Sequence, residues 1–279
     1  MSAAPTGQSL PLRGKRILVT RPEGQADKLL SGICALGGQA AHIPFLAIEP
    51  CADPVGLAHM AHQLSDYRAC LFISVNAVQC AWPGLVPDGW PKTLAAAAVG
   101  PGTVRALRAR GVSEVIVPAS RFDSEGLLAE PFFAESQCRG RAFALIRGDG
   151  GRDLLAQTLR ARGATRVDEV AVYRRCLHPE ALSRLAEWLQ AGSHSLADMI
   201  LISSSESLQR VMAVATATIA TRLRQTPLLV PHPKIADCAR ALGFSSICIS
   251  DGGDDGLLHC LRSYNDTCNT TIMNENKTP

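Results

Sequence analysis

The segment AFALIRGDGGRDLLAQTLRARGA, from Ala142 to Ala164, joins an apolar run to an amphipathic helical pattern through a turn that contains Arg147 and Arg152. The N-terminus of a helix presents free backbone N–H groups that already attract anions. Two additional guanidinium groups therefore indicate a ligand with more negative charge than one phosphate carries. Arg152 strengthens this interpretation, because a cation early in a helix opposes the helix dipole.

Polar and cationic side chains also follow most of the other apolar runs, at the points where parallel strands would end. In open parallel sheets, ligands bind outside the carboxyl ends of the strands. The structural alternatives are helix N-caps for the hydroxyl and amide side chains, and a turn for the histidine, which stands between two prolines. Together with Arg147 and Arg152, we predict as substrate-binding residues Thr20, Arg21, Ser74, Asn76, Thr103, Ser203, Ser204, Ser205, His232 and Lys234.

Most motifs for cofactors and activated nucleophiles are missing. There is no GxxxxGK[ST] loop and no GxSxG turn, and GPGTVR at 100–105 lacks the third glycine of a dinucleotide fingerprint. No pair of carboxylates stands out as an acid–base couple. The ten cysteines show no CxxC pair and no zinc spacing, so we expect free thiols, no metal and no cofactor. A cationic, hydroxyl-rich cleft of this kind is typical of a site for a flexible polyanion.

The composition indicates a globular protein with two domains. Hydrophobic residues make up 47% of the 279 residues, which is enough for two cores. The net charge of +3 is spread along the chain and argues against a nucleic-acid partner. The polar N-terminus and the lack of an apolar run of about 18 residues predict neither a signal peptide nor a membrane partner. We expect a cytoplasmic monomer with disordered residues 1–13 and 264–279.

Short apolar runs alternate with helical periods along almost the whole chain. This alternation predicts an α/β fold of βαβ units, with parallel sheets and helices on both faces. The first helix is expected at about 25–36. The expected strands are 17–20, 41–50, 69–74, 95–100, 114–118, 142–148, 169–175, 198–203, 226–231 and 246–250.

The sequence also contains an internal repeat. A shift of 126 residues places Arg21 on Arg147 and Gly24 on Gly150 without a gap. LFISVNAV at 71 resembles ILISSSES at 200, and the stretch 99–128 resembles 230–258. The repeat predicts two similar domains, each a small doubly wound parallel sheet.

These segments, in this order, resemble the uroporphyrinogen-III synthase family over about residues 15–262. The matching stretches are ILVTRPEGQADKLLSGICALGGQAAHIPFLAIEP (17–50), CLFISVNAV (70–78), AVGPGTVRALRARG (98–111), SEGLL (124–128), ALIRGDGGRDLLAQTLRARGATRVDEVAVYRR (144–175), DMILISSSES (198–207) and HPKIADCARALGF (232–244).

The resemblance implies a discontinuous arrangement of flavodoxin-like domains that tandem repeats alone would not predict. Domain one would comprise 1–46 plus 177–279, and domain two 47–176. An antiparallel two-stranded linker, at about 41–50 and 169–179, would join them, with the substrate cleft between the domains.

The resemblance also implies a cofactor-free lyase of haem and sirohaem biosynthesis. Such enzymes close hydroxymethylbilane, which carries eight acetate and propionate carboxylates, to uroporphyrinogen III. Loss of the terminal hydroxyl gives an azafulvene, and a spiro intermediate then inverts ring D. Tyr173 is the candidate general acid, with a packed hinge tyrosine as the alternative. Lys234 would replace a hydroxyl that relatives often carry, and hydroxymethylbilane synthase would hand over the substrate.

Two other functions fit the same residues. The first is a noncatalytic, two-lobed binding protein that closes around an anionic metabolite. The second is an interaction protein in which Arg21, Arg147 and Arg152 form only surface ion pairs, which contribute about 0–1 kcal/mol each. An assay with hydroxymethylbilane separates both from the enzyme.

Overall fold

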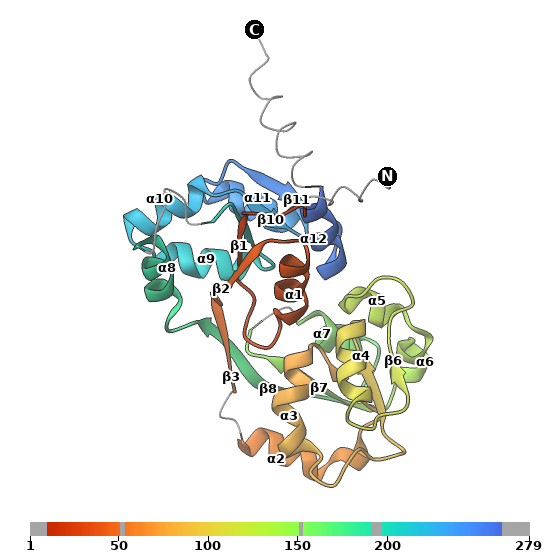
Figure 1. The fold of residues 1–279 in the computed structure, drawn as a ribbon. Helices are drawn as coiled ribbons and strands as arrows, with labels where there is room; N and C mark the ends of the chain where they lie inside the picture. Colours follow the sequence, from red (N-terminus) through yellow and green to blue (C-terminus); the bar gives the residue numbers. More distant parts are fainter. Residues whose placement is uncertain (1–9, 51–53, 151–152, 191–196, 264–279) are drawn as a thin grey trace, which may run out of the picture. The chain divides into compact units, whose positions relative to one another are not determined.

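The computed structural model describes residues 10–50, 54–150, 153–190 and 197–263 (Figure 1). Its contacts divide the chain into two compact units. Unit 1 comprises 1–47 and 176–279, and unit 2 comprises 48–175. That each unit is an independent domain with the boundaries given above remains a prediction. No helix in the described part of the chain combines the length and the apolar character that a membrane span needs.

Unit 1 is built on a five-stranded parallel sheet in the order β11-β10-β9-β1-β2. The strands are β1 (Arg16–Val19), β2 (Gln39–His42), β9 (Met199–Leu201), β10 (Leu228–Val230) and β11 (Ile247–Ile249). The helices are α1 (Asp27–Ala35), α8 (Ala181–Gln190), α9 (Ser205–Val214), α10 (Ala217–Gln225), α11 (Pro233–Ala241) and α12 (Gly253–Arg262).

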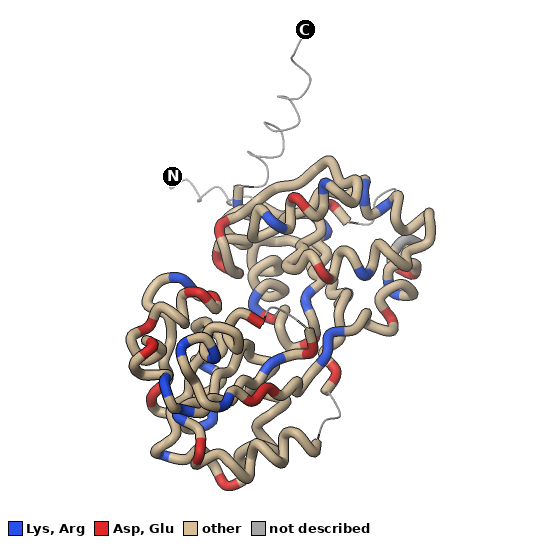
Figure 2. Tube along the Cα trace, turned by 180° about the vertical axis from the view of Figure 1, so that it is seen from behind, with Lys and Arg blue, Asp and Glu red and all other residues tan. Residues whose placement is uncertain are grey.

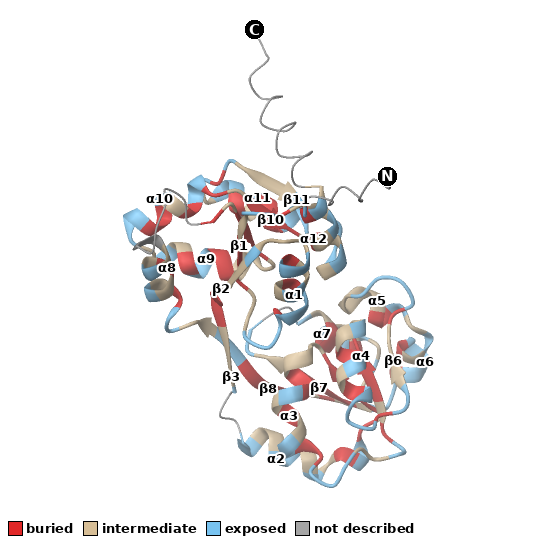
Figure 3. Cartoon of the chain, in the orientation of Figure 1, coloured by how far each residue is buried: buried red, intermediate tan, exposed pale blue. Residues whose placement is uncertain are grey.

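The two faces of this sheet bury different side chains because successive residues of a strand point to opposite faces. Leu18 packs on one face with apolar residues of α8, α9, α10 and α11. Ile17 and Val19 pack on the other face with α1 and α12. Both layers are buried, as Figure 3 shows, so the short strands read as continuous apolar runs.

Unit 2 contributes most of a six-stranded sheet in the order β3-β8-β7-β4-β5-β6. The strands are β3 (Leu46–Pro50), β4 (Ala69–Phe72), β5 (Ala95–Ala98), β6 (Val115–Ile116), β7 (Ala142–Gly148) and β8 (Arg166–Leu177). One face is covered by α2 (Pro54–His62), the short helix Leu64–Asp66, α3 (Val75–Leu85) and α4 (Pro101–Arg108). The other is covered by α5 (Ser124–Ala129), the short helix Pro131–Phe133, α6 (Glu135–Cys138) and α7 (Leu154–Ala161).

The internal repeat matches the strand order of the two sheets. The strands β2-β1-β9-β10-β11 of one sheet correspond to β8-β7-β4-β5-β6 of the other. In the first sheet the chain forms β1 and β2 before it leaves, whereas in the second it forms β4, β5 and β6 before β7 and β8. The same spatial order is therefore reached from different starting strands.

The expected strand at 41–50 is wrong, because the segment contains two strands from different sheets. β2 ends at His42, and β3 begins at Leu46. Between them, Ile43 and Phe45 are buried in the core of unit 1, and their N–H groups donate to the carbonyls of Val19 and Thr20. Burial of both side chains at one corner bends the chain out of the first sheet.

The second strand of this segment, β3, is antiparallel to the end of β8. The N–H of His178 donates to the carbonyl of Phe45, and the thiol of Cys176 to that of Ala47. From the first pair to the second, the residue number falls in β8 and rises in β3, so the two strands run in opposite directions. β8 is longer than expected because its first part also pairs in parallel with β7.

The predicted disorder at 1–13 is wrong for residues 10–13. Leu12 is fully buried in the core beside α1, and its N–H donates to the carbonyl of Leu36 over 2.9 Å. Residues 1–9 and 264–279, to which the rest of this prediction applies, lie outside the described residues.

Candidate functional site

Tyr173 lies within β8, beside the carboxyl ends of β7 and β4. A register shift between Arg147 and Gly148 places Tyr173, rather than Val172, opposite the last residue of β7. The side chain is only 2% exposed. Its hydroxyl lies 3.0 Å from Oγ of Ser74 and accepts from Nη2 of Arg175 over 3.2 Å.

The position of Gly148 leaves room for the tyrosine ring. A Cβ atom at this position would lie 2.6 Å from Cζ of Tyr173 and 2.9 Å from its hydroxyl oxygen. Any larger residue would therefore displace the ring. A cavity of about 160 Å³ opens here, and its lining includes Ser124, Arg147, Gly150, Tyr173 and Arg175.

Arg147, which the sequence presents as a free cation for the ligand, is held by carboxylates of its own unit. Its Nη1 donates to Asp153 over 2.9 Å and to Glu169 over 2.7 Å, and its Nη2 donates to the carbonyl of Gly150. Burial alone would lower the pKa of Arg147, but the two carboxylates outweigh burial and raise the pKa. Arg147 thus shapes the turn from inside, and its charge is already neutralised.

Arg21 has the equivalent position in unit 1 and a different set of partners. Its Nε donates to Oγ of Ser203 over 3.0 Å, and its Nη1 forms an ion pair with Asp254 at 2.5 Å. Its carbonyl bonds to Nε2 of His42 over 2.8 Å. Arg21 therefore links the carboxyl end of β1 to the serine after β9 and to the first turn of α12.

Several predicted site residues cap helices. Ser74 caps α3 by accepting from the N–H of Ala77, and Ser204 caps α9 by accepting from the N–H of Ser207. His232 caps α11, with Nδ1 accepting from the N–H of Lys234. These caps place the start of each helix beside a strand end, where backbone N–H groups attract anions.

The remaining predicted residues differ in how accessible they are. Thr20 is 2% exposed and its hydroxyl donates to the carbonyl of Leu201 over 2.8 Å, while Thr103 is 4% exposed within α4. Asn76 and Ser205 are half-buried in the first turns of α3 and α9, and Lys234 is exposed. Arg152 lies outside the described residues.

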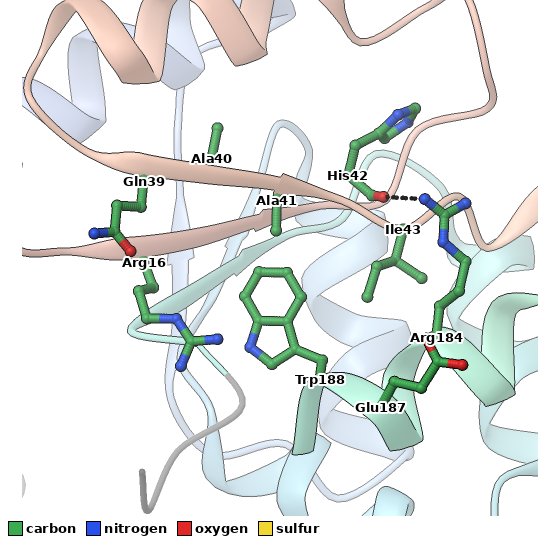
Figure 4. A pocket seen from close by; sticks show the side chains of 9 residues that line it. All are labelled: Arg16, Gln39, Ala40, Ala41, His42, Ile43, Arg184, Glu187 and Trp188. Atoms are coloured by element: carbon green, nitrogen blue, oxygen red, sulfur yellow. Dashed lines mark hydrogen bonds between the residues drawn. The ribbon is translucent and has the colours of Figure 1, made fainter. Parts of the chain in front are cut away.

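Other cavities are built from different residues. The pocket in Figure 4 has a volume of about 490 Å³ and lies along β2 and α8, where Arg16 stacks on Trp188 and Arg184 donates to the carbonyl of His42. It contains no predicted site residue. Lys and Arg are spread over both units (Figure 2).

Sequence reasoning missed Arg175, Gly148 and Asp254. Arg175 could have been found, because residues two apart on a strand share a face, so that Arg175 and Tyr173 point the same way. Its guanidinium carbon lies 5.6 Å from the centre of the tyrosine ring. Asp254 is distant from Arg21 in the sequence, and no local pattern predicts their ion pair.

The fold and these side chains define a class of protein: an α/β protein with two parallel sheets, whose strand ends carry hydroxyl, guanidinium and helix N-terminal donors. Among the residues that the structure describes, no cluster of three or more His, Cys, Asp or Glu side chains could hold a metal ion.

Comparison with known proteins identifies the family. Residues 27–256 match the model of the family described as Uroporphyrinogen-III synthase HemD. The chain is 31% identical over 251 residues to the uroporphyrinogen-III synthase of Escherichia coli K12, covering 88% of this chain and 99% of that protein. It is 32% identical, with the same coverage, to that of Salmonella typhimurium LT2. The chain belongs to the uroporphyrinogen-III synthase family.

Solved structures support the α/β fold. A mutant uroporphyrinogen III synthase from the extreme thermophile Thermus thermophilus matches with a TM-score of 0.57 at 20% identity, covering 92% of this chain and 99% of that one. The uroporphyrinogen-III synthetase of Helicobacter pylori 26695 matches with a TM-score of 0.55 at 13% identity, covering 90% and 99%.

Proposed function

We propose that this chain is a lyase that closes hydroxymethylbilane to uroporphyrinogen III, with inversion of ring D and loss of water, and that Tyr173 donates the proton to the departing hydroxyl. Family membership supports the reaction. The observation that carries the residue assignment is the Tyr173 hydroxyl, which is bonded to Ser74 and Arg175 at the edge of a cavity.

The hydrogen bond from Arg175 leaves the proton of the Tyr173 hydroxyl available for donation. A guanidinium group can only donate, so the phenol oxygen accepts from Arg175. The phenol proton is then free to be donated to Ser74 or to a ligand in the cavity. Ser74 already accepts from Ala77 and keeps one further lone pair for the phenol.

This arrangement suits the first step of the reaction. Hydroxide is a poor leaving group, and a donated proton lets it leave as water. As the proton moves away, negative charge develops on the phenol oxygen, and the guanidinium of Arg175 stabilises that charge without reorganisation. The resulting azafulvene is an electrophile that reacts with ring D of the same substrate molecule, so the later steps need no further reagent.

The cavity holds only one end of the substrate. Its volume of about 160 Å³ is below the roughly 300–1,000 Å³ of sites that enclose drug-sized ligands. We place the hydroxymethyl end of the bilane there and neighbouring carboxylates at Asn76 and the N-terminus of α3. In unit 1, we propose Arg21, Lys234 and the N-termini of α9 and α11 as carboxylate-binding groups. Each charge-assisted hydrogen bond contributes about 1.5–3 kcal/mol, and less where exposed.

Enzyme control of the product follows from holding a flexible chain in one conformation. Spontaneous closure leaves ring D uninverted, so the protein must favour the conformation that leads to the spiro intermediate. We further propose that β3 and β8 link two flavodoxin-like domains. We also propose that the chain works in the cytoplasm and receives its substrate from hydroxymethylbilane synthase.

The test supplies freshly prepared hydroxymethylbilane to the full chain and separates the uroporphyrin isomers after oxidation. We expect mainly the type III isomer, at a rate proportional to protein concentration. Type I isomer at the spontaneous rate would refute the enzyme. If calorimetry then showed that the chain binds the bilane without converting it, the chain would be the two-lobed binding protein considered above.

A further inference from the structure

We propose that Cys248 and Cys260 are an oxidation site, in which a hydroperoxide converts the two thiols into a reversible disulfide that ties α12 to β11. Their sulfur atoms lie 3.3 Å apart and form a hydrogen bond. A disulfide bond is about 2.05 Å long, so the sulfurs need to approach by little more than about 1 Å. The inference is independent of the reaction proposed above.

The fold holds the two thiols against each other. Cys248 is the central residue of β11, the edge strand of its sheet, and Cys260 lies near the end of α12. Both are half-buried and pack on the core face that also buries Leu257 and Leu261 of α12. The thiols are therefore positioned by the helix–sheet packing and not by a loop.

The reactivity of Cys248 differs from that of other cysteines in the chain. The hydrogen bond with Cys260 lowers the pKa of Cys248 to about 7, against the opposing effect of burial. A substantial fraction is then thiolate near neutral pH, and the thiolate is the form that attacks peroxides. By contrast, complete burial raises the pKa of Cys70 and keeps it as an inert thiol.

The chemistry is balanced with hydrogen peroxide as the oxidant. The thiolate of Cys248 attacks one peroxide oxygen, the O–O bond breaks, and a sulfenic acid forms while hydroxide leaves and is protonated to water. The sulfur of Cys260 then attacks the sulfenic sulfur, the S–O bond breaks, and the second water leaves with the thiol proton. Two thiols lose two electrons, and one peroxide is reduced to two waters.

The disulfide would act on α12, whose first turn binds Arg21 at the carboxyl end of β1. Two ion pairs connect the first turn of α12 to neighbouring elements. Asp254 binds Arg21, which follows β1, and Asp255 binds Lys28 in the first turn of α1 at 2.8 Å. Leu258 also fills the space beside Gly32 of α1, where a Cβ would lie 2.6 Å from its methyl carbon. A covalent link at Cys260 restrains this helix against local unfolding.

The first experiment maps disulfides in the full chain. Reduced protein is treated with hydrogen peroxide, remaining thiols are alkylated, and proteolytic peptides are analysed by mass spectrometry. We expect a peptide pair joined through Cys248 and Cys260, with a loss of two hydrogens that dithiothreitol reverses. The proposal fails if peroxide oxidises the exposed Cys34 while Cys248 and Cys260 remain alkylated as separate thiols.

Single substitutions then separate the roles of the two thiols. In Cys260→Ser, Cys248 should stop at the sulfenic acid and be trapped by dimedone, whereas Cys248→Ser should form neither adduct nor disulfide. Cys238→Ser, on α11, is the matched control and should form the disulfide as the wild type does. Oxidation should also raise the thermal midpoint of wild type and Cys238→Ser by several degrees. An equal rise in Cys260→Ser would overturn the proposal.

Discussion

In two sheets of the same strand order, Ser74 and Ser203 each lie two residues beyond the end of a strand, β4 and β9 respectively, yet their partners differ. Oγ of Ser74 contacts the hydroxyl of Tyr173, whereas Oγ of Ser203 accepts from Arg21, both over 3.0 Å. The part of unit 1 that the structure describes contains no tyrosine. The repeat thus supplies the same scaffold twice, and among the described residues only unit 2 adds a tyrosine hydroxyl to it.

The two equivalent arginines differ because of the residue on the neighbouring strand. Leu145 of β7 stands opposite Glu169, and the equivalent Val19 of β1 stands opposite His42. Glu169 draws Arg147 towards β8, while the ring of His42 bonds to the backbone and leaves the guanidinium of Arg21 to reach Ser203. We therefore expect proton transfer to depend on unit 2 and substrate affinity to depend more on unit 1.

The largest effect is expected from Tyr173→Phe, which removes the hydroxyl and keeps the ring. Because general acid catalysis contributes about 100-fold or more, kcat should fall by that factor while KM changes little. Steady-state kinetics with isomer analysis measures both, and the remaining product should shift towards the type I isomer.

Tyr67→Phe is the matched control. Tyr67 is a second buried tyrosine of unit 2, but its hydroxyl donates to Asp168 near the start of β8. Its loss should affect stability and leave kcat unchanged. Nearly full turnover and an unchanged isomer ratio in Tyr173→Phe would instead make Tyr173 a packed hinge tyrosine.

A smaller effect, about tenfold on kcat, is expected from Arg175→Gln. The change removes the charge that stabilises the developing phenolate, and a charge-assisted hydrogen bond exceeds a neutral one by roughly 1 kcal/mol or more. KM should stay within about twofold. The control is Arg174→Gln, which loses an exposed ion pair with Glu49 worth about 0–1 kcal/mol. Equal losses of kcat in both variants would mean that Arg175 does not stabilise the phenolate.

Most of the fold could be predicted because each strand and helix carries its own hydrophobic period. The expected strand 142–148 coincides with β7, and the first helix is found at 27–35. The break at 43–45 could not be predicted, since Ile43 and Phe45 alternate like strand residues and only the core shows where they are buried. The prediction that the chain leaves the first sheet, forms the second and then returns came from the family resemblance, since the repeat alone predicts two consecutive domains.

The site could be predicted only to the level of strand ends. Arg21 and Arg147 were recognised by type and place, but their ion pairs depend on Asp254 and Glu169, which are distant in sequence. The contact of Tyr173 with Ser74 requires a register shift in β8 that no local pattern announces. Contacts between elements that are distant in sequence thus decide which carboxylate each arginine binds.

The arginine pair tests the comparison directly. Arg21→Ala removes a cation and leaves Asp254 unpaired, so that KM should rise about tenfold. Arg147→Ala should raise KM less and lower the free energy of unfolding by about 1–3 kcal/mol, because Asp153 and Glu169 lose a partner that is 13% exposed. Kinetics and denaturant unfolding measure the two effects. An equal rise in KM would mean that Arg147 exchanges its carboxylates for those of the substrate.

The smallest effect is expected from Thr20→Val, which keeps the shape of the side chain and removes its hydroxyl. Since that hydroxyl is buried and donates to the carbonyl of Leu201, the change should cost about 1 kcal/mol of unfolding free energy, with KM unchanged within twofold. Denaturant unfolding and kinetics would show this. A higher KM with unchanged stability would instead mean that the hydroxyl turns towards the substrate. Unit 1 would then contribute a hydroxyl as well as a cation, and affinity would not rest on Arg21 alone.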